Sequence, residues 1–378
     1  MAQRRINMAD IVEGEPLPWD VSDYNGTLLL KKGYVVQRHS QIEALVERGL
    51  FAEESSGPSH GSSHPTPEQE KPSVLRLINL ANKRLERLLF GLHHEPAFAE
   101  KILEVAKVLG YAIDLSPDVA IACVLLNQQA SAYPIRHCTD TAVISTLIAR
   151  SAKIAPEEVA ALTAAALTMN VGMITYHMQL QNKQGALTNE ETELIHQHPQ
   201  AGVKLLESAG VRDPDWLAYV LYHHENEDGS GYLSGKAGKD IPQNAKIISL
   251  ADRYCARISA RDYRKQVLPN AALRDIFLDG GKGIDPGLAA FFIKELGIYP
   301  PGTLVRLVNG EIGVVSKKGE TATTPTVHAL VGPRGVPLSL PVKRETAKES
   351  FAIQETLHEN QANIRFSMHQ IWGDVARL

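Results

Sequence analysis

Five side chains that could bind a metal ion recur at the ends of predicted helices in the middle of the chain. They are His137, His198, His223, His224 and Asp252. Imidazole nitrogens and carboxylate oxygens bind Mn, Fe or Zn, and together they can hold two ions about 3.5–4 Å apart. Helical bundles usually gather such ligands in their cores. These residues therefore predict a metal centre, whereas His177 and His196 are assigned to the ordinary core or surface histidines of helices.

The strongest single motif is "HHENEDGSGY", residues 223–232. Two adjacent histidines run into an acidic turn with two glycines and a tyrosine. Gly229 and Gly231 let the backbone turn sharply beside the ligands, because glycine adopts conformations closed to other residues. The motif predicts either an active metal site or the remnant of one.

The composition limits the classes of function. The chain has 378 residues, 44% of them hydrophobic and 22% charged, which suggests two or three domains with packed cores. A net charge of −4 gives no reason to expect a nucleic-acid partner. No apolar run approaches the roughly 20 residues of a membrane span, and the N-terminus lacks the apolar region of a signal peptide. Three scattered cysteines indicate reduced thiols, so a cytoplasmic location is expected.

The first part of the chain predicts a small module and a linker. Residues 1–52 predict an α+β module, with a hairpin in "GTLLLKKGYVV" and a helix in "SQIEALVERGLF". Residues 53–72, rich in Ser, Pro, Gly and His, predict a flexible linker that cannot bury enough surface to order itself. His60 and His64 are therefore interpreted as solvated linker residues.

The rest of the chain predicts a mainly α fold. Residues 73–297 carry apolar positions at three- and four-residue spacing, and "TNEE" at 188–191 predicts a capping box. Residues 298–345 predict a small β module with an Asn-Gly turn in "NGEIGVV". Residues 346–378 predict a terminal amphipathic helix that either mediates self-association or folds back on the bundle.

Several blocks resemble the HD-GYP group of the HD-domain metal-dependent phosphohydrolases. The blocks are "GALTNEETELIHQHPQAGVKLLESAG", "HHENEDGSGYLSG" and "IPQNAKIISLADRYCARISARDYRK", and the resemblance covers roughly residues 130–300. It implies an HD-domain helical bundle and a bi- or trinuclear metal centre that hydrolyses cyclic di-GMP. It also implies that the five residues above are metal ligands, and that Tyr232, Arg261 and Arg264 bind the nucleotide.

The chain departs from the family pattern at five positions. The His-Asp pair and lysine of an "HDIGK"-like block correspond to Met169, Asn170 and Met173 in "MNVGM". The glutamate expected four residues before His137 is Tyr133, and the proline of the GYP triplet is Leu233. A neutral Asn170 bridges two metals poorly, and the Met169 thioether suits Cu(I) better than Mn, Fe or Zn. Fewer ions than in active family members are therefore expected.

Three functions remain open from the sequence. The first is a degenerate HD-GYP protein that binds cyclic di-GMP, or acts as a scaffold for diguanylate cyclase (GGDEF) domains, with little or no hydrolysis. The second is a phosphodiesterase with a reduced or unusual metal centre, because one ion can still activate a water molecule. The third is a structural protein in which the histidines are vestigial or hold a structural zinc.

Overall fold

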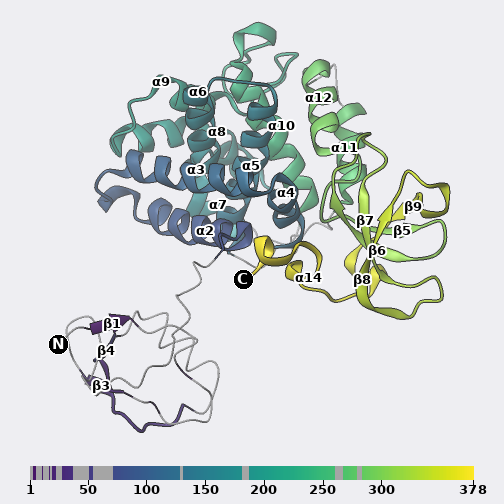
Figure 1. Ribbon diagram of the computed structural model, residues 1–378. Coiled ribbons are helices and arrows are strands. Elements are labelled where there is room, and N and C mark those ends of the chain that lie inside the picture. Colours follow the sequence, from purple (N-terminus) through teal and green to yellow (C-terminus); the bar gives the residue numbers. More distant parts are fainter. Residues whose placement is uncertain are drawn as a thin grey trace. The chain divides into compact units, whose positions relative to one another are not determined.

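The computed structural model contains two compact units, Met1–Glu68 and Gln69–Leu378 (Figure 1). The structure describes residues 3–5, 11, 17, 19–22, 28–36, 51–53, 71–127, 131–180, 187–259, 267–278 and 283–378. Several predictions fall outside these residues: most of the linker, the helix in "SQIEALVERGLF" except Phe51, which lies in a strand, and the nucleotide-binding candidates Arg261 and Arg264. The five predicted segments and the four boundaries between them stay predictions.

The first unit contains an antiparallel four-stranded sheet in the order β1-β4-β2-β3. Its strands are β1 (Gln3–Arg5), β2 (Val21–Ser22), β3 (Leu28–Leu30) and β4 (Phe51–Glu53). The predicted hairpin differs in its pairing, because β3 pairs with β2. The turn at Gly33, with φ +90°, instead carries Tyr34 back to Leu17, whose amide donates to the Tyr34 carbonyl at 2.8 Å.

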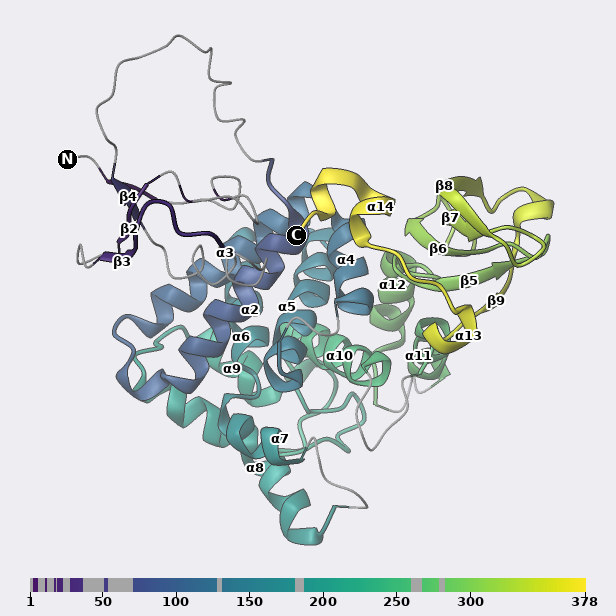
Figure 2. The same ribbon diagram turned by 90° about the horizontal axis from the view of Figure 1, so that it is seen from below.

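The second unit is a helical bundle followed by a small sheet, which confirms the predicted mainly α fold (Figures 1 and 2). The larger helices are α2 (Val74–Phe90), α3 (Phe98–Leu115), α4 (Pro117–Leu126), α5 (Tyr133–Ser151), α6 (Pro156–Thr168), α7 (Ile174–Leu180), α8 (Asn189–Ser208), α9 (Pro214–Tyr222), α10 (Gln243–Ile258), α11 (Pro269–Leu278) and α12 (Pro286–Leu296). Helix α5 is buried from Tyr133 to Ala149 and packs against α6 and α10. Apolar burial around this central helix is the main driving force for the fold.

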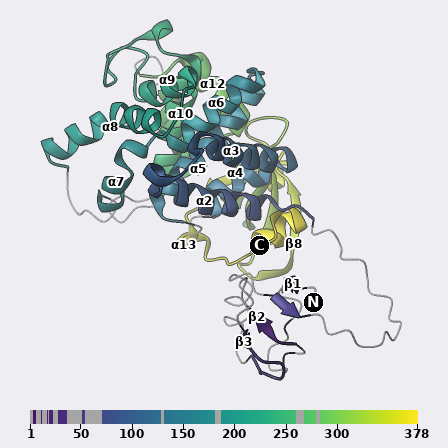
Figure 3. The same cartoon turned by 90° about the vertical axis from the view of Figure 1, so that its left-hand side faces the viewer.

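Local sequence signals set the helices that carry the predicted ligands. The capping box predicted at 188–191 is confirmed, since the Glu191 amide donates to Thr188 Oγ1 at 3.2 Å and the Thr188 amide to Glu191 Oε2 at 2.7 Å. This cap begins α8, whose N-terminal half projects from the bundle (Figure 3). Asp213 caps α9, and Trp216 on that helix donates to Thr168 Oγ1 at 2.8 Å, which ties α9 to the end of α6.

One helical stretch among the described residues, Pro156–His177, could cross a bilayer by length and hydropathy alone. Within it, 72% of the apolar window is buried inside the unit, as expected for a core helix. Helices α3 and α4 pass the same test only as a pair, and they are bent by 112° at Ser116.

The sheet of the second unit is antiparallel, in the order β8-β7-β6-β5-β9. Its strands are β5 (Leu304–Leu307), β6 (Ile312–Lys317), β7 (Thr326–Val331), β8 (Pro337–Glu345) and β9 (Ile353–Thr356). Strands β5 and β6 pair across the predicted Asn-Gly turn, and Gly310 has a φ of +88° there. A positive φ is open to glycine at no steric cost, so this turn follows directly from the sequence.

The tail differs from the single terminal helix predicted for 346–378. The 3₁₀ helix η5 (Glu349–Phe351) leads into β9, which pairs with β5. The short helices α13 (Glu359–Ala362) and α14 (Met368–Trp372) and the 3₁₀ helix η6 (Gly373–Ala376) follow. Helical continuity is broken at Asn363 and Gly373, which both have positive φ. The tail folds back, since Ser73 Oγ donates to the Arg377 carbonyl at 2.5 Å beside the start of α2, and self-association stays a prediction.

Candidate metal centre

Four helices bring the five predicted metal ligands to one region of the bundle. His137 lies in the second turn of α5, His198 in the middle of α8, and Asp252 in α10. His223 caps the C-terminus of α9, and His224 follows it. Gly172, in the short 3₁₀ helix η3 (Val171–Met173), allows the backbone to approach α8 closely. A Cβ atom there would lie 2.2 Å from the His198 carbonyl oxygen.

Three of the five form a tight cluster. One ring nitrogen each from His198, His223 and His224 lies within 4.8 Å of the others, and this is the only such group found among the described residues. The Nε2 atoms of His198 and His223 are 3.3 Å apart. The His223 and His224 rings are separated by 4.0 Å between centroids. Three imidazoles at this spacing match the histidine sets that hold zinc-like ions.

The backbone fixes which nitrogen of two of these rings carries the proton. His198 Nδ1 is 2.5 Å from the Ile195 carbonyl, and His223 Nδ1 is 2.7 Å from the Val220 carbonyl. A carbonyl oxygen can only accept, so each Nδ1 is the donor and each neutral ring has a bare lone pair at Nε2. The two lone pairs face each other at 3.3 Å with no proton between them. A cation between them would remove the repulsion.

Burial keeps the cluster neutral. It lowers the pKa of His198 to about 3, with a further contribution from His223. Burial also lowers the pKa of His223. The pKa of His224 is lowered by burial and by His223, although Asp252 acts in the opposite direction. Neutral imidazole is the form that binds a metal.

His137 and Asp252 form a pair of their own beside the cluster. His137 Nε2 lies 2.6 Å from Asp252 Oδ1. Burial by itself would raise the pKa of Asp252, but the hydrogen bond with His137 holds it below its usual range. Asp252 is therefore ionised and accepts a hydrogen bond from His137 Nε2. That nitrogen is then already engaged in a hydrogen bond.

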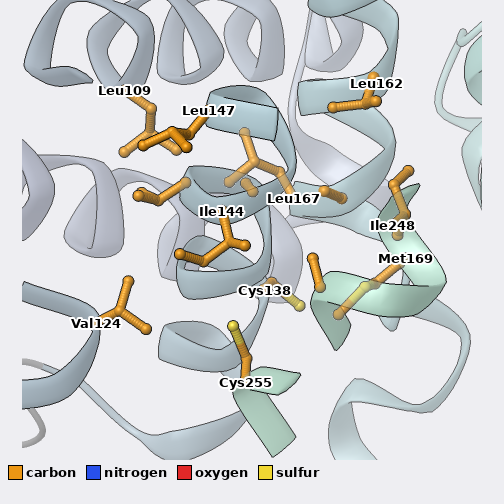
Figure 4. Close-up of a cluster of buried hydrophobic side chains, with 14 of the residues drawn as sticks. Leu109, Val124, Cys138, Ile144, Leu147, Leu162, Leu167, Met169, Ile248 and Cys255 are labelled. Carbon is orange, nitrogen blue, oxygen red and sulfur yellow. The ribbon is translucent and has the colours of Figure 1, made fainter. Parts of the chain in front are cut away.

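The substituted positions have partners within the protein. Met169 is fully buried, near Cys138 and Ile248 in the core (Figure 4). Asn170, also buried, hydrogen-bonds the Cys138 thiol through its side chain and backbone, while burial raises the pKa of that thiol to about 12. The Tyr133 ring stacks on His137 at 5.2 Å between centroids. Met173 is half-buried in η3 and brings no charge.

Two histidines assigned to ordinary positions in fact border the candidate site. His177 on α7 lies edge-on to the rings of Tyr133 and His137, at 5.3 Å and 6.3 Å. His196 on α8 stacks on Tyr232 at 4.2 Å. The sequence could have predicted the position of His177, because this residue lies on an apolar helix two turns after Asn170. The stacking of His196 on Tyr232 joins α8 to a loop that is distant in the sequence, so no local spacing of residues predicts it.

The glycine-rich motif folds into a loop that covers His224. Gly229 has a φ of +77°, and a Cβ on Gly231 would lie 2.5 Å from the His224 carbonyl oxygen. The predicted sharp turn is thus present at both glycines. Buried Glu225 accepts from the Ser234 amide at 2.7 Å and closes the loop. Leu233, which stands where the resemblance implies a proline, is 36% exposed.

A basic residue missed in the sequence lies next to this loop. Arg253 follows Asp252 on α10 and hydrogen-bonds the Asn226 side chain. Its charge lowers the pKa of both His224 and Tyr232, although burial raises the pKa of Tyr232 overall. Arg253 therefore supplies positive charge near the three histidines, where a phosphate group would need it. The sequence could have indicated Arg253 because it directly follows the predicted ligand Asp252.

Comparison with known proteins places the helical region in a known class. Residues 115–288 match the family model described as HD domain. A cyclic di-GMP phosphodiesterase of Pseudomonas aeruginosa is 31% identical over 219 residues, which cover 58% of this chain and 52% of that protein. The cyclic di-GMP phosphodiesterase response regulator RpfG of Xanthomonas campestris is 34% identical over 144 residues, 38% of each chain.

The chain spans about half or less of the length of these curated relatives. Among solved structures, an HDG"Y"P protein from Bdellovibrio bacteriovorus aligns with a TM-score of 0.48 and 14% identity. That alignment covers 77% of this chain and 98% of the other. The likeness lies below the level that demonstrates a shared fold.

Proposed function

Because residues 115–288 form an HD domain related to bacterial cyclic di-GMP phosphodiesterases, we propose that the chain is a nucleotide-binding signalling protein. It binds one divalent metal ion (Zn, Fe or Mn) and a cyclic dinucleotide, cyclic di-GMP first. It hydrolyses that nucleotide slowly or not at all. The proposed location is the cytoplasm, where such a nucleotide would be available.

One observation carries the proposal of a single ion. The bare Nε2 lone pairs of His198 and His223 face each other at 3.3 Å, with His224 beside them. Both rings are buried, and burial lowers the pKa of each, which disfavours relief of the contact by protonation. A divalent ion held by the three imidazoles, with further positions open to water or phosphate, fits this donor set.

The other side of the centre supports a reduced ion count. Asn170 is engaged with Cys138, Met169 is enclosed in the core, and the Asp252 carboxylate accepts from His137. Asn170 brings a neutral amide where a bridge between two ions needs a carboxylate, and Asp252 already accepts at Oδ1 from His137. Two dications at bridging distance repel strongly without such an anion. Hydrolysis through a dinuclear centre is therefore not expected.

Charge near the histidines supports a phosphodiester ligand. Arg253 lies on α10 next to the candidate ligand Asp252, and its guanidinium suits phosphate oxygens. Arg261 and Arg264 remain predicted nucleotide contacts. The names of the relatives point to cyclic di-GMP as the first ligand to test. The proposal also includes docking of a diguanylate cyclase (GGDEF) domain on the loop around Leu233.

The test combines binding and turnover on one preparation. Calorimetry would measure cyclic di-GMP binding to protein loaded with Zn, Mn or Fe(II), and chromatography would follow the linear dinucleotide and GMP. We expect binding with one metal per chain, and affinity lost severely in Arg261→Ala. Unchanged affinity in that variant, or no binding by folded wild-type protein, would contradict the proposal. Lys204→Ala, an exposed change on α8, is the matched control.

A mononuclear phosphodiesterase is the second candidate. The three-histidine cluster favours it, because one ion with an open position can lower the pKa of a bound water. If the wild-type chain hydrolyses the nucleotide and His223→Ala and Asp252→Ala each abolish this turnover, the phosphodiesterase is favoured over a protein that only binds the nucleotide. A purely structural role predicts a stable metal-free chain that binds no nucleotide.

A further inference from the structure

The three clustered histidines are oriented in two different ways. The rings of His198 and His223 are each fixed by a bond from Nδ1 to a backbone carbonyl three residues earlier. Among the described residues, no hydrogen bond fixes the His224 ring. Its ring instead stacks on Tyr232, with centroids 4.6 Å apart and planes inclined by 27°. The third imidazole therefore needs a different device to keep its nitrogen aimed at the cluster.

Tyr232 is itself held from its other face. The His196 ring stacks on it at 4.2 Å, with planes inclined by 20°. His196, Tyr232 and His224 thus form a ladder of three nearly parallel rings that joins α8 to the loop after α9. With both faces covered, Tyr232 offers a nucleotide only its edge, and no face on which a base could stack.

The loop backbone sets the position of Tyr232. Its amide donates to the His224 carbonyl at 3.2 Å, so the tyrosine folds back over the histidine. This return needs Gly231, because a Cβ there would lie 2.4 Å from the Asn226 amide and 2.5 Å from the Glu225 Cα. Buried Glu225, which accepts from the Ser234 amide at 2.7 Å, closes the loop behind the tyrosine.

We propose that His196 and Tyr232 act as a stacking clamp that fixes the His224 imidazole as the third metal ligand. The inference rests on the proposed function, because it takes a metal ion held by His198, His223 and His224 as given. Both clamp residues are positioning residues. Parallel offset rings attract through their faces, so the clamp needs two aromatic planes and does not need the tyrosine hydroxyl.

The first test measures metal affinity without turnover. Co²⁺ would be titrated into metal-free protein in competition with a chromophoric chelator, and its visible absorption would report the ligand geometry. Loss of an outer partner of a ligand typically costs 10–100-fold in metal affinity. We expect Tyr232→Leu to weaken binding about tenfold and change the spectrum, and Tyr232→Phe to restore both. Tyr111→Leu, the same change at a half-exposed tyrosine of α3, is the control.

The second test acts from the other end of the ladder, on a different element. His196→Ala should weaken binding in the same direction, and His196→Phe should restore it, because phenylalanine keeps the plane and loses the nitrogen donors. Circular dichroism would show that each variant is folded. This pair keeps the inference testable if Tyr232→Leu fails to fold.

The outcomes separate the clamp from the metal site. If wild-type protein binds one ion and the Leu and Ala variants bind it equally well, the clamp is wrong and the proposed metal site stands. If His196→Phe fails to restore metal affinity, His196 acts through its ring nitrogens, and the proposal that it acts by stacking is overturned. If folded wild-type protein binds no ion, both proposals are wrong.

Discussion

The two sides of the candidate metal centre are both built on buried helices, but their polar atoms are used differently. On the side of α8 and α9, His198 and His223 direct bare Nε2 lone pairs at each other. On the side of α5 and η3, His137 is bonded to Asp252 and Asn170 to Cys138. The difference teaches that the capacity to bind a metal depends on whether unsatisfied donor atoms converge, because His137 Nδ1 also lacks a hydrogen-bond partner among the described residues but lies outside the group of three histidines.

The largest expected effect comes from removing a histidine on the first side. His223→Ala should lower the bound metal from about one ion per chain to nearly none after dialysis, because two imidazoles hold a divalent ion weakly. His137→Ala is the matched change on the second side and should leave the metal content nearly unchanged. Elemental analysis measures both. Equal losses in the two variants would mean that the sides do not differ as described.

The next prediction attempts to convert the second side into the first. The double change Met169→His and Asn170→Asp introduces an imidazole and a carboxylate at the end of α6, beside η3, which packs on α8. A bridging carboxylate offsets the repulsion between two dications, so the metal content should rise from one toward two ions per chain. Measured turnover of cyclic di-GMP should rise with it. A folded double variant that still holds one ion would mean that Met169 and Asn170 do not account for the lower ion count.

Close packing between the two sides gives the third prediction. Gly172 separates η3 from α8, and an added Cβ would lie 2.2 Å from the His198 carbonyl oxygen and 2.6 Å from the Gly202 amide. Both neighbours are backbone atoms, so the helices must move apart. Gly172→Ala should lower the free energy of unfolding by about 1–3 kcal/mol in urea titrations. A loss no larger than that of Lys204→Ala would show that this contact can relax freely.

A buried acid on α5 gives a pH dependence to the second side. Asp140 is 3% exposed, with Arg136 Nε 3.7 Å from its carboxylate. Burial raises the pKa of Asp140 to about 8, against the lowering influence of Arg136. Between about pH 4 and about pH 8, Asp140 therefore keeps its proton in the folded chain. In the unfolded chain the same carboxyl releases its proton above its usual pKa of about 4. Stability should fall by up to about 1.4 kcal/mol per pH unit as the pH rises from about 4 to about 8.

Asp140→Asn removes this titration and should flatten the decline. Urea midpoints at about pH 6 and about pH 8 would be compared for the wild type and the variant, because other groups also titrate in this range. A wild-type decline equal to that of the variant would mean that Asp140 is ionised throughout. In that case Arg136 would stabilise the charge better than burial opposes it.

The sequence predicted the first side of the centre better than the second. The "HHENEDGSGY" turn and the capping box of α8 are local signals, and the three histidines they position do cluster. The stacking of His196 on Tyr232 and the packing of Gly172 on α8 join residues far apart in the chain, so no periodicity could reveal them. The tail was assigned as one helix because its apolar spacing suits a helix, but pairing with β5 overrode that local preference.

The smallest expected effect decides how Met169 should be interpreted. If it is a core residue, as its full burial near Cys138 and Ile248 indicates, Met169→Leu conserves volume and should cost less than about 1.5 kcal/mol. Metal content and metal affinity should not change, because leucine only removes a thioether that binds Mn, Fe or Zn poorly. A clear loss of metal affinity in a stable Met169→Leu variant would instead make the sulfur a ligand. The second side would then not be closed to metal, and the contrast between the two sides would narrow to Asn170 and the His137–Asp252 pair.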